Sequence, residues 1–516
     1  MTGDPATLVS EPTMTTGRSD PGTAGRTPTG GGRNRLSGLD AARGIALLAM
    51  MAVHSLYVVD EAGRPTWWYS IFGGRAAAVF AVLAGVGLAL TTGRRRVRAG
   101  DALATTAALG VRALLIGAAG LALGYTDPAV AAVILPYYAV MFLLAIPLVF
   151  LPTGAVAVLG GVLAIGMPAL SHALRADLPA PTMANITAGH LVDDPVGLLT
   201  ELSLTGYYPA LPWLAYLCAG LVIGRLDLTR ARVAGGLLLV GTALAATAAA
   251  VSTLLLDWRG SAEITAAQPG SGLTPEETQS LLAFGGDGTT PTTTWWWLAV
   301  NAPHTGTPPY LVGTIGTAMA LLGLTLLAGH HIAHPTWRRV TAAVLTPLAA
   351  AGALTFSLYA AHIVFINSSW DTFDATDGYL LQVAVALPLA LGLRATIGRG
   401  PLEGALYKIT KWVRAHTATR SQPVRRQSRA TAPDVLDGRT HIDDQAATEE
   451  VPESHDPPHR MLVPAGQFSL PGNGSPQTLV IEIVIEGSGQ IRLRIDVDDS
   501  ADRIATTSNG RHDTTR

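Results

Sequence analysis

Long apolar segments recur along the chain, and they restrict its fold more than any other feature of the sequence. Most are close to the roughly 20 residues that an α-helix needs to cross the hydrocarbon core of a bilayer. A helix suits this environment because its backbone N–H and C=O groups are bonded within the segment. The sequence therefore predicts an all-α polytopic membrane bundle of about ten transmembrane helices. They are expected at about 37–59, 72–92, 104–125, 129–150, 153–172, 209–226, 232–255, 308–329, 341–366 and 378–397.

The charges between these segments predict the orientation of the bundle. One alternating set of loops is rich in basic residues, including Arg94, Arg95, Arg96, Arg98, Arg225, Arg230, Arg338 and Arg339. The other set is rich in acidic residues, including Asp60, Glu61, Asp193, Asp194, Asp257, Asp371, Asp374 and Asp377. Because basic loops stay on the cytoplasmic side, we expect a multi-pass protein of the cell membrane with both termini in the cytoplasm.

Composition changes at both ends of the apolar region. The first residues are rich in Gly, Thr, Pro and Ser and lack the apolar core of a signal peptide, which is typical of disorder. Near the other end, residues 478–486 and 490–497 alternate apolar and polar side chains around Gly487-Ser488-Gly489, which predicts a β-hairpin. We expect a disordered tail (1–34), a transmembrane domain (35–412), a polar linker (413–460) and a cytoplasmic tail (461–516).

The first apolar segment carries polar side chains toward both of its ends. Arg43 and His54 are eleven residues apart, which places them within about 20° on one helix face and about 16 Å apart along its axis. Arg43 could be a positive-inside anchor and Asp40 a carboxylate that suits the helix dipole. His54 could be a structural histidine at a helix contact, but an ionisable group within a span usually faces a cavity or a partner. We therefore interpret Arg43 and His54 as two points on one line through the interior.

Further polar residues fall at a similar depth near the predicted outer face. Arg75 opens the second span, His304 precedes the eighth and His362 lies toward the end of the ninth. Imidazole exchanges protons near neutral pH, so these histidines favour acid–base chemistry over a metal site, and we predict no metal. Cys218 is the only cysteine, which excludes intramolecular disulfides and cysteine-based structural zinc sites.

Two other basic features have alternative interpretations. Arg112 lies within the third span, where it could extend toward the inner surface or line a cavity. His330, His331 and His334 lie beside Arg338 in a predicted cytoplasmic loop. We interpret them as a solvated basic loop, with contact to anionic lipid or a phosphate as the alternative.

The first predicted span also contains a motif found in a known group of membrane proteins. Gly38-Leu39-Asp40-Ala41-Ala42-Arg43-Gly44 is followed, with ten residues between Arg43 and the histidine, by His54. This arrangement resembles transmembrane acyltransferases, which include heparan-α-glucosaminide N-acetyltransferase-like proteins, membrane acyltransferase family 3 and a related uncharacterised bacterial inner-membrane family. The resemblance covers about residues 35–412. Other similar segments are Gly74–Phe80, Leu135–Val140, Tyr208–Trp213, Leu354–His362 and Arg399–Glu403.

One departure limits what this resemblance implies. The catalytic histidine of the heparan enzyme follows the first span, where this chain has Arg64-Pro65-Thr66-Trp67-Trp68. His54 is instead similar in position to the histidine of family 3. The departure leaves the sugar acceptor of the heparan enzyme unassigned for this chain.

The resemblance implies an acyl-CoA-dependent O- or N-acyltransferase. Acyl-CoA, in particular acetyl-CoA, would be the donor, and a hydroxyl or amine of an extracytoplasmic glycan or envelope acceptor would receive the acyl group. His54 would act as general base, with Asp40 and Arg43 at the donor phosphates. The candidate substrate-binding residues are Arg75, His304, Tyr359 and His362.

Two other functions stay open at this point. Ionisable residues and interrupted helices also suit a transporter or exporter of a small molecule or envelope precursor without acyl chemistry. A scaffold whose function depends on the C-terminal tail is the third alternative. The expected partners are membrane lipids, acyl-CoA and the acceptor, with a homodimer as one conceivable assembly. The net charge of −2 gives no reason to expect nucleic acid.

Overall fold

The computed structural model describes residues 31–330, 335–419, 459–468, 477–485 and 491–498. The chain divides into two compact units, residues 1–428 and 429–516. Most of the expected N-terminal tail and polar linker lies outside the described residues, as do His331 and His334. At the described edges of these two segments, residues 31–34 and 413–419 are helical.

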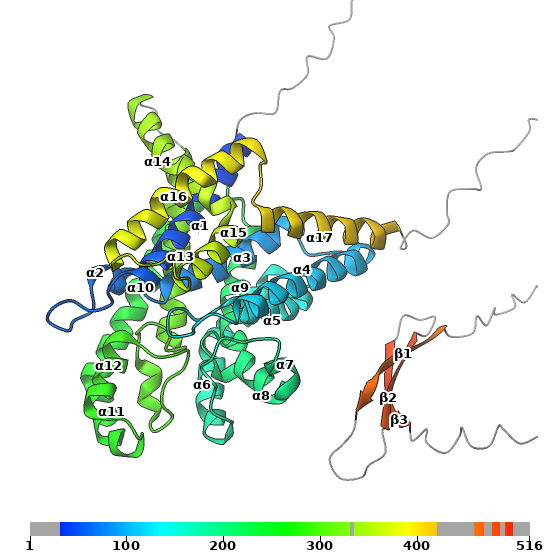
Figure 1. Ribbon diagram of the computed structural model, residues 1–516, viewed down its shortest axis with the longest axis horizontal. Coiled ribbons are helices and arrows are strands. Elements are labelled where there is room, and N and C mark those ends of the chain that lie inside the picture. The colour runs from blue at the N-terminus through cyan, green and yellow to red at the C-terminus, as the bar shows by residue number, and fades with distance from the viewer. Residues whose placement is uncertain (1–30, 331–334, 420–458, 469–476, 486–490, 499–516) are drawn as a thin grey trace, which may run out of the picture. The chain divides into compact units, whose positions relative to one another are not determined.

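Helices make up the regular structure described in the first unit (Figure 1). The longer helices are α1 (Gly31–Ser55), α3 (Arg75–Thr91), α4 (Ala102–Leu123), α5 (Leu135–Leu148), α6 (Thr153–Leu174), α9 (Ala210–Arg225), α10 (Ala231–Leu255), α12 (Pro275–Phe284), α13 (Pro308–His330), α14 (Pro335–Ala353), α15 (Thr355–Ile366), α16 (Ala375–Thr396) and α17 (Pro401–Thr419). The short elements are α2 (Trp67–Phe72), η1 (Ala99–Asp101), η2 (Arg175–Asp177), α7 (His190–Asp193), α8 (Pro195–Thr200), η3 (Glu201–Thr205), η4 (Leu256–Gly260), α11 (Ser261–Ala267), η5 (Gln268–Gly270) and η6 (Trp295–Ala299).

The described residues of the second unit form a three-stranded sheet. Its strands are β1 (His459–Phe468), β2 (Gln477–Ile485) and β3 (Ile491–Asp498), antiparallel and in the order β1-β2-β3. β2 and β3 lie on the two segments whose alternating pattern predicts strands, whereas β1 was not predicted from the sequence. The predicted turn between β2 and β3 lies outside the described residues.

The first unit has the helices of a membrane protein. Six described helices are long and apolar enough to cross a membrane, and the number reaches eight if each of two bent helix pairs is one span. α1 is not among the six, because its charged and polar side chains reduce its hydropathy. α5 is shorter than the expected span at 129–150, since its helix starts only at Leu135.

The prediction of one continuous helix is wrong for one of the expected spans. The segment predicted at 341–366 bends by 78° between α14 and α15. Leu354 leaves the helical conformation at the bend, with φ −118° and ψ 23°. Contacts with residues distant in sequence stabilise the bend, and the local pattern gives no sign of it.

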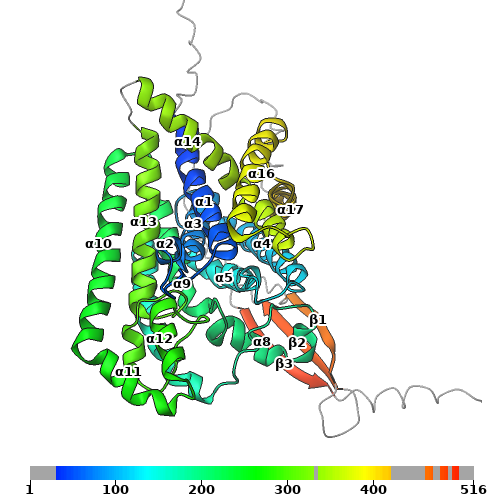
Figure 2. The ribbon, with the colours of Figure 1, turned by 60° about the vertical axis from the view of Figure 1, so that its left-hand side comes forward.

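α1 lies at the centre of the bundle. It packs against α3, α13, α14, α15 and α16. α10 runs beside α13, and the two views agree on this long pair, with α11 and α12 at one of its ends (Figures 1 and 2). The central position of α1 turns its polar side chains toward protein, in a bundle where α3 packs on α9 and α4 on α5.

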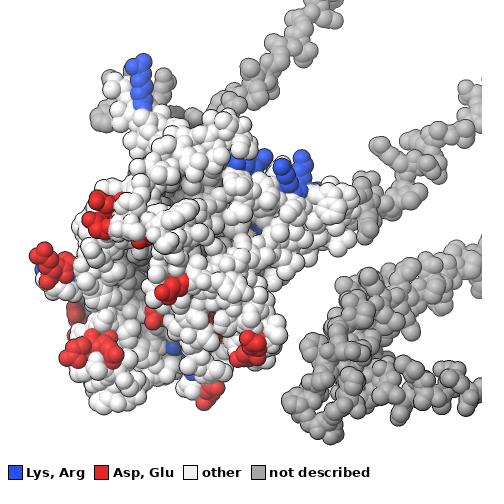
Figure 3. Space-filling model, in the orientation of Figure 1, with Lys and Arg blue, Asp and Glu red and all other residues white. Residues whose placement is uncertain are grey.

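Charges separate toward the two ends of the first unit. On the face drawn in Figure 3, Lys and Arg gather over α14 and the region where α16 meets α17. Asp and Glu gather toward the other end, where α2, α11 and α12 lie. The separation follows the alternation of basic and acidic loops along the chain.

Close helix contacts in this bundle depend on glycine, and one pair allows a direct test. A Cβ atom on Gly220 of α9 would lie 1.9 Å from the Val82 carbonyl oxygen of α3, whereas a Cβ on Gly236 of α10 would meet nothing within 4 Å. We expect Gly220→Ala to lower the free energy of unfolding by about 1–3 kcal/mol, because α3 and α9 must separate. Gly236→Ala is the matched control and should cause no loss. Unfolding in mixed micelles would measure both, and equal stability of the two variants would contradict this packing.

Candidate active site

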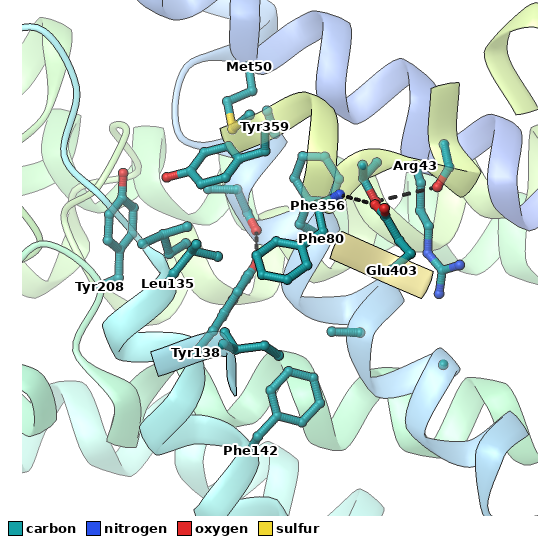
Figure 4. Close-up of a pocket in the computed structure, with 18 of the residues that line it drawn as sticks. Arg43, Met50, Phe80, Leu135, Tyr138, Phe142, Tyr208, Phe356, Tyr359 and Glu403 are labelled. Atoms are coloured by element: carbon teal, nitrogen blue, oxygen red, sulfur yellow. Dashed lines mark hydrogen bonds between the residues drawn. The ribbon is translucent and has the colours of Figure 1, made fainter. Parts of the chain in front are cut away.

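A cavity of about 420 Å³ lies inside the helical unit. Its wall is formed by several elements, which include α1, α3, α4, α5, α15, α17 and the loop before α13. Most of the wall is apolar and aromatic, and Figure 4 shows Phe80, Tyr138, Phe142, Phe356 and Tyr359 around the central space. The polar side chains are few and gather toward the two ends of the α1 segment, where Arg43 and His54 both line the cavity.

His54 forms part of a hydrogen-bonded chain. Its Nδ1 lies 3.1 Å from Nε2 of His362, and the two ring planes differ by only 4°. Nδ1 of His362 lies 2.5 Å from Oε1 of Gln382 on α16, whose Nε2 donates to Ser55 Oγ at 3.2 Å. His362 is 3% exposed and is not among the cavity-lining residues. The structure therefore joins His54 and His362, with His54 at the cavity and His362 behind it.

His304 reaches the same cavity from the loop before α13. Its backbone is in the left-handed region, with φ 54°, a conformation that costs about 1–3 kcal/mol and is enriched at functional sites. Burial lowers the pKa of His304 to about 4, so the ring is neutral at pH 7. Its Nδ1 is buried without a hydrogen-bond partner among the described residues. A buried polar atom of this kind is suited to a ligand.

Tyr359 is a second unpartnered group at this cavity. It lies on α15, is 7% exposed, and its hydroxyl is buried without a hydrogen-bond partner among the described residues. In Figure 4 the hydroxyl points toward Tyr208, another lining residue. The ring of Tyr208 in turn contacts His304, with 5.5 Å between the ring centroids. Tyr359 and His304 thus line the same aromatic part of the wall.

Arg43 is held by backbone and carboxylate together. It donates to Asp40 Oδ1 at 3.2 Å and to the Leu83 carbonyl oxygen at 3.3 Å. Asp40 also forms an ion pair with Arg394 of α16 at 3.6 Å. Asp40 is not among the cavity-lining residues, so the structure places it as a support for Arg43.

Arg112 brings a second guanidinium group to the cavity. It lies above the ring of Phe142 at 5.0 Å, close enough to Arg43 for electrostatic repulsion between the two groups. Within the described part of the chain, its Nε is buried without a hydrogen-bond partner and no carboxylate forms an ion pair with it. Of the two alternatives raised by the sequence, the structure favours a cavity-lining Arg112. Two like charges at one apolar cavity are suited to an anionic ligand.

The bend between α14 and α15 exposes backbone N–H groups that need acceptors. Glu403 of α17 supplies them: Phe356 N donates to its Oε1 at 2.7 Å and Ser357 N donates to the same oxygen at 3.0 Å. Ser357 Oγ donates to Oε2 at 2.5 Å and accepts from Leu402 N at 3.1 Å, so the first turns of α15 and α17 cap each other. Figure 4 shows Glu403 at the cavity wall near Arg43.

Arg75 is the candidate that the structure does not bring to this cavity. Its guanidinium donates to the Ser70 carbonyl oxygen at 2.6 Å. It lines a separate hollow of about 50 Å³ together with Asn301 and Tyr310. Its role as a substrate ligand stays a prediction without support from this geometry.

Sequence reasoning missed Gln382 and the capping role of Glu403. A signal for Gln382 was present, because an amide within an apolar span is costly and usually has a partner. Glu403 belonged to a segment noted for its resemblance, but nothing local indicated that its partner would be the start of α15. No group of three or more His, Cys, Asp or Glu among the described residues could hold a metal ion.

The fold and the cavity define a class: a helical membrane protein whose interior holds a hydrogen-bonded histidine pair and two guanidinium groups. Comparison with known families makes the class more specific. Residues 35–252 match the family "Heparan-alpha-glucosaminide N-acetyltransferase, catalytic", which confirms over this region the resemblance seen in the sequence. The matched region contains Arg43, His54 and Arg112, whereas His304, Tyr359 and His362 lie beyond it. No curated protein matches the chain.

Proposed function

We propose that this protein is a membrane-embedded acyltransferase that uses cytosolic acyl-CoA, with acetyl-CoA as the expected donor. The acceptor would be a hydroxyl or amine of an extracytoplasmic glycan or another envelope component. The observation that carries the proposal is a single cavity lined by Arg43 and Arg112 as well as by His54, His304 and Tyr359. The separation of basic from acidic side chains supports an orientation with Arg43 toward the cytoplasm.

The two arginines suit the anionic part of the donor. Charge-assisted hydrogen bonds from guanidinium to phosphate are among the strongest polar contacts in proteins. Phe80 and Phe142 line the cavity, so an uncharged pantetheine arm would meet an apolar surface. About 16 Å of α1 separates Arg43 from His54, a distance that an extended arm can cover while its thioester reaches the histidine.

His54 would act as the general base. Nδ1 is engaged by His362, which leaves Nε2 for the acceptor in the cavity. As the acceptor oxygen or nitrogen bonds to the thioester carbonyl carbon, its proton moves to Nε2 and the carbonyl electrons move to oxygen. The C–S bond then breaks, and the CoA sulfur leaves with the electron pair and takes the proton from His54. The products are the acylated acceptor, free CoA thiol and neutral His54.

Tyr359 and His304 would stabilise the negative oxygen formed on the way. Each has a buried polar atom that no other described residue hydrogen-bonds, and both line the cavity beside the aromatic wall. Hydrogen-bond donors that are already oriented toward a developing oxyanion accelerate acyl transfer, with about 10²–10³ in rate for a single donor. In this role, the unpaired atoms of Tyr359 and His304 would find their partner in the substrate.

The purified protein in nanodiscs allows a direct test. With acetyl-labelled acetyl-CoA and an envelope glycan fraction, we expect free thiol and labelled acceptor to form in equal amounts. Absence of both under conditions where the protein stays folded would contradict the proposal. Uptake of label into proteoliposomes without thiol release would instead support a transporter.

A further inference from the structure

The side chains behind His54 form a hydrogen-bonded chain whose direction follows from the orientation of the Gln382 amide. Gln382 is 8% exposed, and its amide oxygen faces Nδ1 of His362 while its amide nitrogen faces Ser55. In this orientation the amide oxygen only accepts hydrogen bonds, so Nδ1 of His362 carries the proton. In the neutral form of that ring Nε2 is an acceptor, and His54 donates to it from Nδ1. Nε2 of His54 is left without a proton.

We propose that Gln382 is a positioning residue that holds His54 in the tautomer required of a general base. The proposal rests on the acyltransferase function proposed above. Gln382 does not line the cavity and acts only through His362. Its amide oxygen makes Nε2 of His362 the acceptor, and the proton on Nδ1 of His54 follows from that. When His54 takes a proton from the acceptor, the resulting cation keeps its hydrogen bond to His362.

Among the described groups around the His54–His362 pair, Gln382 is the one placed to orient it. The titratable side chains that line this part of the cavity from neighbouring elements are His304, Tyr208 and Tyr359. The one carboxylate among the described lining residues, Glu403, lies near Arg43 and is engaged by the first turn of α15. Among the described residues, no carboxylate forms an ion pair with His54 or His362. The neutral amide is therefore the group that orients the histidine pair.

Three variants separate this role from a structural one. Gln382→Leu removes the acceptor, so the histidine pair can reverse and direct an N–H of His54 into the cavity. We expect kcat to fall about 100-fold with little change in the KM of acetyl-CoA, because the contribution of a general base is lost. Gln382→Glu keeps an acceptor and should retain most of kcat. Ala386→Gly, one turn further along α16 and also buried, is the control for loss of helix stability.

The pH profile supplies a readout that packing alone would not change. A carboxylate at position 382 favours the protonated form of the histidine pair, so the acidic limb of kcat/KM should move up by about one pH unit in Gln382→Glu. Ala386→Gly should lower the melting temperature without moving this limb. Equal activity of Gln382→Leu and wild type would overturn the proposal. Loss of activity in Gln382→Glu without loss of folded protein would overturn it as well, because the amide would then be needed as a donor.

A measurement without turnover separates this proposal from the acyltransferase assignment. In ¹⁵N-histidine-labelled protein, the ring nitrogen shifts of His54, assigned by comparison with His54→Asn, should show a protonated Nδ1 and a bare Nε2. Gln382→Leu should change that pattern. If the wild-type pattern is found but no thiol is released from acetyl-CoA, the acyltransferase function fails while the role of Gln382 in the tautomer stands. A protonated Nε2 in the wild type would refute the role of Gln382.

Discussion

His54→Ala is expected to lower kcat for acyl transfer by about 10²–10⁴-fold. The variant removes an imidazole that lines the cavity and is hydrogen-bonded to a second histidine. Donor binding should change little, because Arg43 and Arg112 stay in place. Thiol release from acetyl-CoA at saturating donor would measure the loss.

The matched control is a buried histidine outside the cavity. His172 of α6 is 3% exposed and packs against Trp295, with 4.7 Å between ring centroids. His172→Ala should reduce stability but keep kcat close to that of the wild type. Turnover in His54→Ala at the level of His172→Ala would remove His54 from the mechanism.

Arg112→Gln and Arg43→Gln are each expected to raise the KM of acetyl-CoA by about tenfold or more. A hydrogen bond to a charged group contributes about 1.5–3 kcal/mol, which corresponds to roughly 10–100-fold in binding. The double variant should bind the donor more weakly than either single variant, while kcat at saturation falls far less. Initial rates over a range of donor concentrations would test this.

A shortened donor makes the role of the arginines specific. S-acetyl-pantetheine has the thioester and the arm of acetyl-CoA but lacks its phosphates, so its KM should be nearly the same in wild type and in both arginine variants. Arg230→Gln is the control, since Arg230 is largely exposed and pairs with Asp227 outside the cavity. An equal rise of KM for both donors would show that the arginines act on the fold and not on phosphate.

The sequence was most informative where a single helix carries the relevant residues. Helix periodicity put Arg43 and His54 on one face, and both line the cavity. Helix periodicity could not show which helices are neighbours in the bundle. The depth of a residue along its span does not indicate which other span lies beside it. His362 came to His54 as expected for its depth, whereas Arg75 did not join them. Gln382 of α16 also belongs to the site, although it was not predicted as a site residue.

The broken span shows a second limit. The local sequence before Leu354 is rich in alanine and favours a continuous helix. The bend is compatible with the bundle because Glu403 accepts hydrogen bonds from Phe356 and Ser357, 47 and 46 positions earlier in the chain. Local propensity cannot include a partner that far away. Hydropathy also does not show where a span is bent by distant contacts. The number of spans therefore depends on whether each bent helix pair is counted as a span.

The reciprocal capping of α15 and α17 also has a consequence for biosynthesis. The ribosome makes Ser357 well before Glu403, so the amides that begin α15 have no carboxylate to bind while the intervening α16 is being inserted into the bilayer. This side of the cavity can take its final form only after translation has passed position 403. One wall of the cavity therefore comes from α17, which is synthesised after the other helices that line it, and a nascent chain stopped before α17 would lack that wall.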